Sequence, residues 1–498
     1  MRNTAASGGR PLAYGLPAGF FTLVGTLVEC SLEERLQACR RLHAESLESP
    51  RRFWLREAGL LDWVRPPEEA FAGDMIRGDL SWFAGGLLSP AWNAVDRHAS
   101  VSPERTALVW ARAEGDLVAW SFRRLRQESA RMAQVLLAQG VRWGDRVVAY
   151  LPETPTLAML HLGCARIGAV PVAVPVSAPA LLERVLRATR ARVLVTADAA
   201  AAVGEPVPLW EHVEEAVGGL GRVESVLVER RAGAEVSLVY GRDHDLGVAL
   251  LRARPTCAVR PCDAEDPLLL TTAPGADGPP VLHAIAGFLV GSALGLREAA
   301  GIGPGAQVLC TEGFAGARVD VLWGTWVLGG SLVFDERGDG ASRPRALGLT
   351  HLLGPRAALA AAGPSVLGVA LDGSDAAVSP VWSADGGGML AARFGDLGGT
   401  PLFGIEPVLV DPSGRRVERG GADAELCVRR AWPSQPRTQE QDHAGFVAQR
   451  LEHFPGLYRT GQRCRLLEDG SLLWTGSVAT ARPTAGKLFP LEGPIGQA

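Results

Sequence analysis

The feature of this sequence that most constrains its fold is a regular alternation of short β-branched runs with helical stretches. Apolar runs at residues 146–151, 170–176 and 192–196 are separated by helical patterns at 155–167 and 180–189. Such alternation predicts parallel strands joined by crossover helices, because a parallel neighbour can be reached only through a long connection. We therefore expect a doubly wound α/β sheet in this part of the chain.

The same rhythm returns further along the chain. Strands are expected at 267–272, 307–310 and 331–334, with helices at 284–299 and 319–328 between them. Each repeat of strand and helix adds a parallel strand with a covering helix. Two such halves predict two stacked α/β subdomains.

The two ends of the chain have a different character. Residues 31–62 are expected to be helical, with Ser31 as an N-cap and Glu34 completing a capping box. From about residue 395 the strands are short and separated by Gly, Pro and Asp turns, which predicts a small β-barrel or meander. The domains expected in chain order are a helical N-terminal region (1–98), a first α/β subdomain (99–264), a second (265–394), a β-barrel subdomain (395–476) and a tail (477–498).

Charge and cysteine content limit the classes of partner. The net charge is -4 and no basic block occurs, so neither nucleic acid nor an anionic membrane is expected as a partner. The eight cysteines are scattered without a C-x-x-C pair, which argues against a zinc site and favours free thiols in a reducing cytoplasm. No segment reaches the ~18 uninterrupted apolar residues of a membrane span. The prediction is a cytoplasmic protein.

Short motifs occur in a fixed order between residues 45 and 490. They include Phe53-Trp54, the GDRVVAYLP run at 144–152, ARIGAV at 165–170, AWP at 431–433 and WTG at 474–476. Together they resemble the AMP-forming acetyl-CoA synthetases of the acyl-adenylate-forming (ANL) superfamily. That resemblance implies a large domain of two α/β subdomains and a β-barrel, followed by a mobile C-terminal domain that this chain, ending at Ala498, would lack.

The resemblance also implies a two-step reaction. In the family a carboxylate attacks the α-phosphate of ATP to give acyl-AMP and pyrophosphate, and the thiol of coenzyme A then takes the acyl group. The first step needs cations on the phosphates and a lysine at the reacting carboxylate. The single lysine of this chain, Lys487, does not align with that catalytic lysine.

The phosphate loop departs from the family pattern. Where the family has Y-T-S-G-S-T-G-K-P-K-G, residues 272–280 are TAPGADGPP. Gly275 and Gly278 persist, but both lysines and the hydroxyls inside the loop are missing, and Asp277 adds a negative charge. Proline supplies no N–H donor to a phosphate. We predict a structural loop rather than a phosphate cradle.

The other nucleotide motifs have changed as well. In the family pattern W-W-Q-T-E-T-G-G, Trp382 falls where a tryptophan floors a small acyl pocket, and Asp385 replaces the glutamate that holds magnesium. Gln462 replaces the aspartate that accepts both ribose hydroxyls, and Ser477 replaces a later arginine. Arg184 matches an arginine that meets the coenzyme A phosphate in the family.

These changes lead to three hypotheses for the function. The first is a catalytically impaired acetyl-CoA synthetase homologue that acts as a binding, regulatory or scaffold partner of a protein such as a synthetase, a carrier protein or a pathway enzyme. The second is an acyl-activating enzyme, active alone or completed by another chain, that forms short-chain acyl-AMP and acyl-CoA. The third is a carboxylate or acyl-CoA sensor built on the Trp382 pocket. No catalytic residue, metal ligand or cofactor is assigned, because the changed motifs argue against binding of ATP with magnesium and of coenzyme A.

Overall fold

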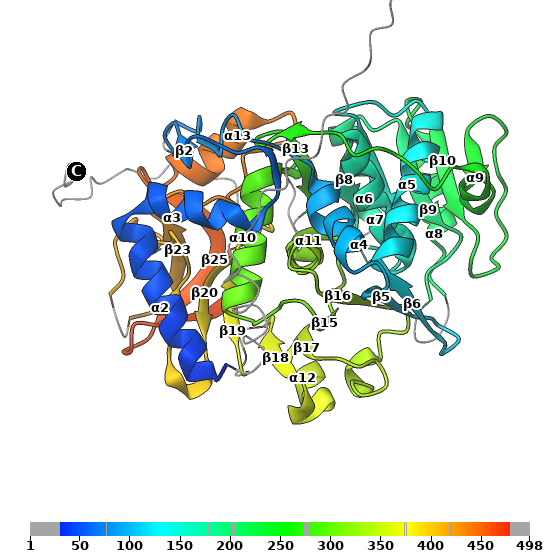
Figure 1. The fold of residues 1–498 in the computed structure, drawn as a ribbon. Helices are drawn as coiled ribbons and strands as arrows, with labels where there is room; N and C mark the ends of the chain where they lie inside the picture. Colours follow the sequence, from blue (N-terminus) through cyan, green and yellow to red (C-terminus); the bar gives the residue numbers. More distant parts are fainter. Residues whose placement is uncertain are drawn as a thin grey trace, which may run out of the picture.

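An eight-stranded sheet forms one half of the molecule (Figure 1). The computed structural model describes residues 30–478 except 76, 178, 202–205, 273–277, 373, 375, 419 and 420. The strand order is β11-β10-β9-β7-β8-β13-β14-β24, parallel from β11 to β13 and antiparallel beyond. The strands are β7 (Arg146–Tyr150), β8 (Val170–Ala173), β9 (Val193–Ala197), β10 (Ser225–Glu229), β11 (Asp243–Asp245), β13 (Pro267–Thr271), β14 (Val281–Ala284) and β24 (Thr438–Gln439).

Helices cover both faces of this sheet. The chain moves from β7 to β8 in one direction and from β8 back past β7 to β9 in the other, so right-handed crossovers place α6 and α7 on opposite faces. Helix α5 packs on α6, and α8 packs on α7. The doubly wound α/β class expected from the sequence is confirmed. The helices are α5 (Phe122–Ala138), α6 (Pro155–Ile167), α7 (Pro179–Thr189) and α8 (Leu209–Gly218).

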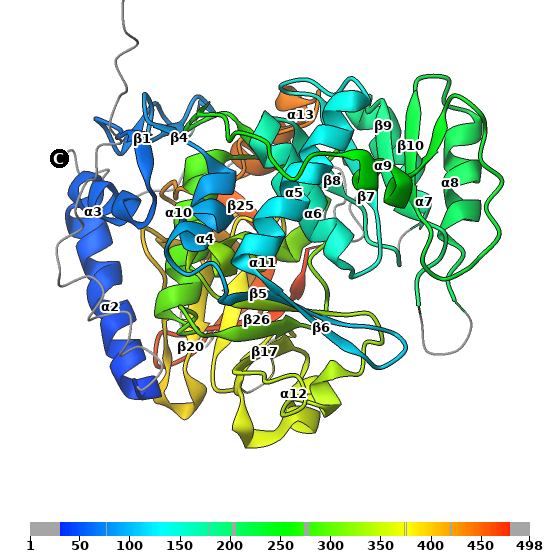
Figure 2. The same ribbon diagram turned by 45° about the vertical axis from the view of Figure 1, so that its right-hand side comes forward.

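A second sheet of six strands has the order β18-β17-β15-β16-β5-β6. It is parallel except for the β5–β6 hairpin, which Figure 2 shows alongside this sheet, although it precedes β7 in sequence. Conversely β13, β14 and β24 join the first sheet, so the strands of the two sheets are interleaved along the chain. The strands are β5 (Thr106–Ala111), β6 (Leu117–Ser121), β15 (Gln307–Cys310), β16 (Ser331–Asp335), β17 (His351–Gly354) and β18 (Leu367–Ala370).

The region expected to be a barrel or meander consists of two antiparallel sheets. One contains β19-β20-β21 and the other β22-β23-β25-β26, and β26 packs against all three strands of the smaller sheet. No strand pairing among the described residues closes them into a barrel, because β21 and β22 remain edge strands. The strands are β19 (Ser379–Trp382), β20 (Met389–Arg393), β21 (Gly399–Pro401), β22 (Pro407–Val410), β23 (Ala424–Val428), β25 (Tyr458–Leu466) and β26 (Leu472–Ser477).

The N-terminal helices pack against the side of this assembly (Figure 1). Helix α2 (Leu32–Glu48) begins at Ser31, whose hydroxyl accepts the Glu34 N–H at 3.2 Å while the Glu34 carboxylate accepts the Ser31 N–H at 2.8 Å. The expected capping box is therefore confirmed. Helix α2 continues into α3 (Pro50–Glu57) and contacts α10 (Ile285–Glu298) and β21. No helix in the described part of the chain is long and apolar enough to cross a bilayer.

A buried ion pair joins three of the packed elements. Arg166 of α6 is 1% exposed; it pairs with both carboxylate oxygens of Asp96 and donates to Ser129 Oγ of α5 at 3.0 Å. Asp96 ends the helical turn Trp92–Asp96 that follows the N-terminal helices. The Arg166 guanidinium cannot lose its proton, so its burial depends on the negative charge of Asp96.

Replacing Asp96 by alanine should therefore destabilise the fold strongly. Asp96→Ala leaves Arg166 buried without its counter-ion, and we expect the free energy of unfolding to fall by about 3–5 kcal/mol. Urea denaturation followed by circular dichroism measures this change. Glu183→Ala, which breaks an exposed pair with Arg187 on α7, is the matched control and should cost at most about 1 kcal/mol. Equal losses in the two variants would contradict the assignment.

Candidate functional site

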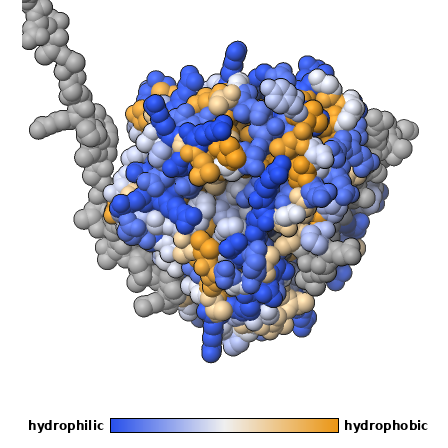
Figure 3. All heavy atoms as spheres, turned by 90° about the vertical axis from the view of Figure 1, so that its right-hand side faces the viewer, coloured by the Kyte–Doolittle hydropathy of each residue, from blue (hydrophilic) through white to orange (hydrophobic). Residues whose placement is uncertain are grey.

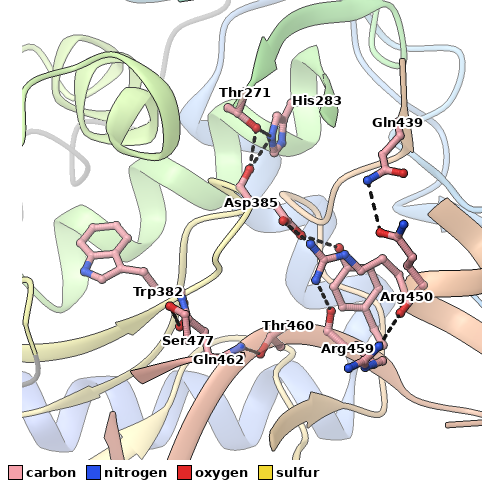
Figure 4. A network of polar contacts seen from close by, with 12 residues as sticks. Thr271, His283, Trp382, Asp385, Gln439, Arg450, Arg459, Thr460, Gln462 and Ser477 are labelled. Carbon is pink, nitrogen blue, oxygen red and sulfur yellow. Dashed lines mark hydrogen bonds and ion pairs between the residues drawn. The ribbon is translucent and has the colours of Figure 1, made fainter. Parts of the chain in front are cut away.

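The candidate site lies on the turn between β19 and β20, opposite the carboxyl ends of the first sheet (Figure 4). Gly386 and Gly388 have φ of +80° and +81°, a region that favours glycine, and they allow the chain to reverse within a few residues. The reversal places the Asp385 carbonyl against the end of β13, where it accepts the Thr271 hydroxyl at 2.7 Å. His283 Nε2 lies 3.0 Å from the same carbonyl. The turn is thus anchored to the first sheet.

The carboxylate of Asp385 is paired with an arginine of the same chain. Asp385 is 1% exposed. One carboxylate oxygen forms an ion pair with the Arg450 guanidinium, and the other accepts a hydrogen bond from the Tyr458 hydroxyl at 3.3 Å. Burial raises the pKa of Asp385, while Arg450 and Tyr458 act in the opposite direction. Arg450 is held in turn by the Arg459 carbonyl at 3.0 Å. Both oxygens of this buried carboxylate therefore have partners within the chain.

The side-chain amide of Gln462 also makes hydrogen bonds within the chain. Its Nε2 donates to the Trp382 carbonyl at 2.8 Å. Its Oε1 accepts the Trp474 indole N–H at 2.7 Å and the Ser477 hydroxyl at 3.2 Å. The structure therefore brings Trp382, Gln462 and Ser477, which come from three different motifs, together through hydrogen bonds to the Gln462 amide. Both lone pairs of the amide oxygen are occupied, so it has none left for a ribose hydroxyl.

The indole ring of Trp382 is stacked against an arginine side chain. Arg318, the residue before α11 (Val319–Val327), lies over the ring with its guanidinium carbon 4.4 Å from the centroid. Trp382 is 6% exposed and Arg318 8%. Sequence reasoning found neither Arg318 nor Arg450, because no local motif marks an arginine whose partner is distant along the chain.

The remaining predicted site residues do not enter this network. Gly275 and Asp277 lie outside the described residues, as does Lys487. A Cβ added at Gly278 would approach Gln439 Nε2 at 3.1 Å, so this glycine allows a close contact with β24. Arg184 is exposed on α7, which packs against α8 and β7. Across the described residues no group of three or more His, Cys, Asp or Glu side chains is arranged to hold a metal ion.

Comparison with known proteins decides the family. Residues 95–361 match the family model described as AMP-binding enzyme, and residues 39–94 match acetyl-coenzyme A synthetase N-terminus. The chain belongs to the AMP-binding enzyme family. It is 31% identical to the acetyl-coenzyme A synthetase of Syntrophus aciditrophicus and to acetyl-coenzyme A synthetase 2 of Pseudomonas putida, in each case over 88% of this chain and 76% of the relative.

The fold of this AMP-binding family member has a solved counterpart. Acetoacetyl-CoA synthetase from Streptomyces lividans superimposes with a TM-score of 0.74, at 21% identity, over 88% of this chain and 74% of that one. At this level of identity the comparison shows the fold alone. The resemblance to acetyl-CoA synthetases stated from the motifs is confirmed by the family models and relatives.

In this AMP-binding family member, a buried carboxylate that follows β7 also has a shifted pKa. Glu153 accepts the Phe314 N–H at 3.1 Å, and its other oxygen is buried with no hydrogen-bond partner among the described residues. Burial raises the pKa of Glu153 from 4.5 to about 7. The folded protein therefore holds this proton more tightly than the unfolded chain does.

The stability of the fold should depend on the ion pair between Asp385 and Arg450. Arg450→Gln leaves the buried Asp385 carboxylate without its cation, and we expect a loss of about 3–5 kcal/mol in unfolding free energy. Urea denaturation measures it. Adding Asp385→Asn to the same chain removes the uncompensated charge and should recover much of the loss. If the double variant loses as much unfolding free energy as Arg450→Gln and Asp385→Asn lose together, the two residues are not coupled and the pairing is contradicted.

The Glu153 carboxylate should make stability depend on pH. Because its pKa is raised on folding, its contribution is present below pH 4.5 and is lost as the pH rises toward 7. Relative to Glu153→Gln, the wild-type chain should lose about 2–3 kcal/mol of unfolding free energy over that interval. Urea denaturation at intervals across the range checks this. Glu104→Gln, at an exposed position, serves as the control, and a flat difference between wild type and Glu153→Gln would disprove the shift.

Proposed function

We propose that this chain is a catalytically impaired acetyl-CoA-synthetase-like protein that works by binding rather than by forming acyl-adenylates. The observation that carries the proposal is the pairing of Asp385 with Arg450 and Tyr458. By the resemblance, Asp385 stands where the family holds magnesium. Here that carboxylate is already neutralised by a cation that belongs to the chain.

Electrostatics supports the proposal at the metal position. A buried carboxylate that has a guanidinium partner gains little from a divalent ion, because the ion must first separate a desolvated pair. Separation would also leave the Arg450 charge beside an incoming cation, where like charges repel. Magnesium delivered with ATP would therefore meet an occupied site. The family chemistry needs that metal charge to neutralise the phosphates.

The sugar position supports the same conclusion. Gln462 would have to break its bonds to Trp474 and Ser477 before its carbonyl could accept ribose hydroxyls. Its amide is neutral, so the bonds it could offer are weaker than those of a carboxylate. The positions that the resemblance gives to the metal and to the ribose are thus both occupied by contacts within the chain.

The binding partner is proposed to be a protein, such as a synthetase, a carrier protein or a pathway enzyme. The chain keeps the layered fold of its relatives while the site is filled, which favours a role for its surfaces. The face at the right of Figure 1 is mostly hydrophilic with scattered apolar side chains (Figure 3). Such a face suits a partner that associates through polar contacts and dissociates readily.

The second candidate is an acyl-activating enzyme that forms short-chain acyl-AMP and acyl-CoA, alone or with a second chain. The relatives named acetyl-coenzyme A synthetase favour it. It requires Arg450 to leave Asp385 when nucleotide enters. The two candidates therefore differ in whether ATP with magnesium binds at all.

Calorimetry with ATP and magnesium separates them. We expect no saturable heat for this chain and no pyrophosphate exchange in the presence of acetate, because Arg450 occupies the metal position. The acetyl-coenzyme A synthetase of Syntrophus aciditrophicus, assayed in parallel, is the positive control. Micromolar binding of ATP, or exchange above background, would refute the impaired assignment.

Crosslinking in the native cell, followed by purification without nucleotide, should recover one dominant protein partner.

A further inference from the structure

A cavity with a volume of about 400 Å³ lies at the carboxyl ends of β5, β10 and β11. Its wall is completed by the first turn of α6 and by α9 (Leu246–Arg252). Strand β10 and helix α9 lie at the right of Figure 1, well away from the β19–β20 turn. The carboxyl ends of parallel strands are the edge at which α/β folds bind ligands, and this volume is typical of small-molecule sites.

The wall at the end of β10 is held in place by the fold itself. Asp198 is 1% exposed, and its carboxylate accepts the backbone N–H groups of residues 231–234 at 2.9 to 3.2 Å. The Arg231 guanidinium lies over the ring of Trp110, 4.8 Å from its centroid, and pairs with the Glu336 carboxylate. The cavity is therefore preformed, as ligand sites usually are.

Glu229, the last residue of β10, presents a carboxylate without a counter-ion to this cavity. It accepts the hydroxyls of Thr156 at 2.8 Å and Thr154 at 3.2 Å. Among the described residues it forms no ion pair, and the neighbouring Arg231 pairs with Glu336 instead. Burial raises the pKa of Glu229, while the two hydroxyls act in the opposite direction. A carboxylate withdrawn from water in this way is stabilised by a cation that enters beside it.

The next residue, Arg230, presents the opposite charge to the same cavity. Its Nε lies 3.5 Å from the Asp245 carboxylate. Its two terminal nitrogens make no hydrogen bond within the described part of the chain, so the planar fork is open to the two oxygens of a carboxylate. Leu246 and Leu250 of α9 add an apolar surface to the cavity wall.

The charges around the cavity disfavour a ligand of one sign. A cation would be repelled by Arg112, Arg230 and Arg231, and an anion by Glu229 and Asp245, all of which line the cavity. A ligand that carries one charge of each sign meets an opposite charge at both ends. Its net charge of zero also leaves the balance of the surrounding ion pairs unchanged.

We propose that this cavity binds a free α-amino acid with an aliphatic side chain. The ammonium group pairs with Glu229, the carboxylate pairs with the fork of Arg230, and the side chain packs on Leu246 and Leu250. None of these residues belongs to the Asp385 position, so the inference goes beyond the proposed function and holds whether or not nucleotide binds. It gives the chain a second binding site that is specific for a zwitterion.

Calorimetric titration of the full chain with three matched ligands tests both charges. L-Leucine carries both groups, isocaproate lacks the ammonium group and isoamylamine lacks the carboxylate. We expect saturable binding of leucine, and binding at least roughly tenfold weaker for each analogue, because each loses a hydrogen-bonded ion pair. Affinity equal to that of leucine for either analogue would overturn the assignment, and so would the absence of saturable heat with leucine.

Variants identify the two charged contacts. Glu229→Gln, which can still accept from the threonines, and Arg230→Gln should each weaken leucine binding by at least roughly tenfold. Arg345→Gln, at an exposed arginine outside the cavity, is the matched control and should bind leucine as wild type does. Circular dichroism reports whether each variant folds, and if one does not, the other decides. Wild-type affinity in a folded variant at either position contradicts the proposal.

Discussion

The contact on which the site depends is the buried pair of Asp385 and Arg450. It joins the β19–β20 turn to the start of β25, since Tyr458 donates to the same carboxylate and the Arg459 carbonyl accepts from the same guanidinium. Through its main-chain carbonyl, Asp385 also holds Thr271 of the first sheet. A single residue therefore connects three sheets. In such a network each polar group is satisfied only while the others stay in place, so the site is rigid for the same reason that it is closed.

Arginine suits this role better than lysine would. The guanidinium remains charged at every relevant pH and offers donors in a fixed plane, so it can serve as a permanent internal cation. Arg166 and Arg231 illustrate this, each paired with a carboxylate buried beside it. The chain has a single lysine in its whole sequence.

Local features could be predicted from the sequence, and distant pairings could not. The capping box at Ser31 depends on residues three apart, and strands β7, β8, β9 and β13 of the first sheet are local apolar runs, so both were predicted. The other four strands of that sheet, β10, β11, β14 and β24, were not predicted. The placement of β5 and β6 beside β16 depends on contacts more than two hundred residues apart, about which a local pattern carries no information. The motif positions of Asp385 and Gln462 came from resemblance. The hydrogen-bond partners of these residues could not be predicted in this way. Arg450, for example, is 65 residues from Asp385 and belongs to no motif.

In the proposed function, the filled metal position and the retained fold have a common cause. A buried carboxylate that no longer receives a metal ion must protonate, unfold its surroundings or acquire a cation. Arg450 provides the third solution and so removes the destabilisation that an empty metal site would leave. In the same proposal the contact opposes entry of a metal ion, because entry requires a desolvated ion pair to break. Changing Gln462 alone would not reopen the site, since the metal position would still be filled. On this proposal, opening the metal position has to begin at Arg450, and its first effect would be to weaken the fold.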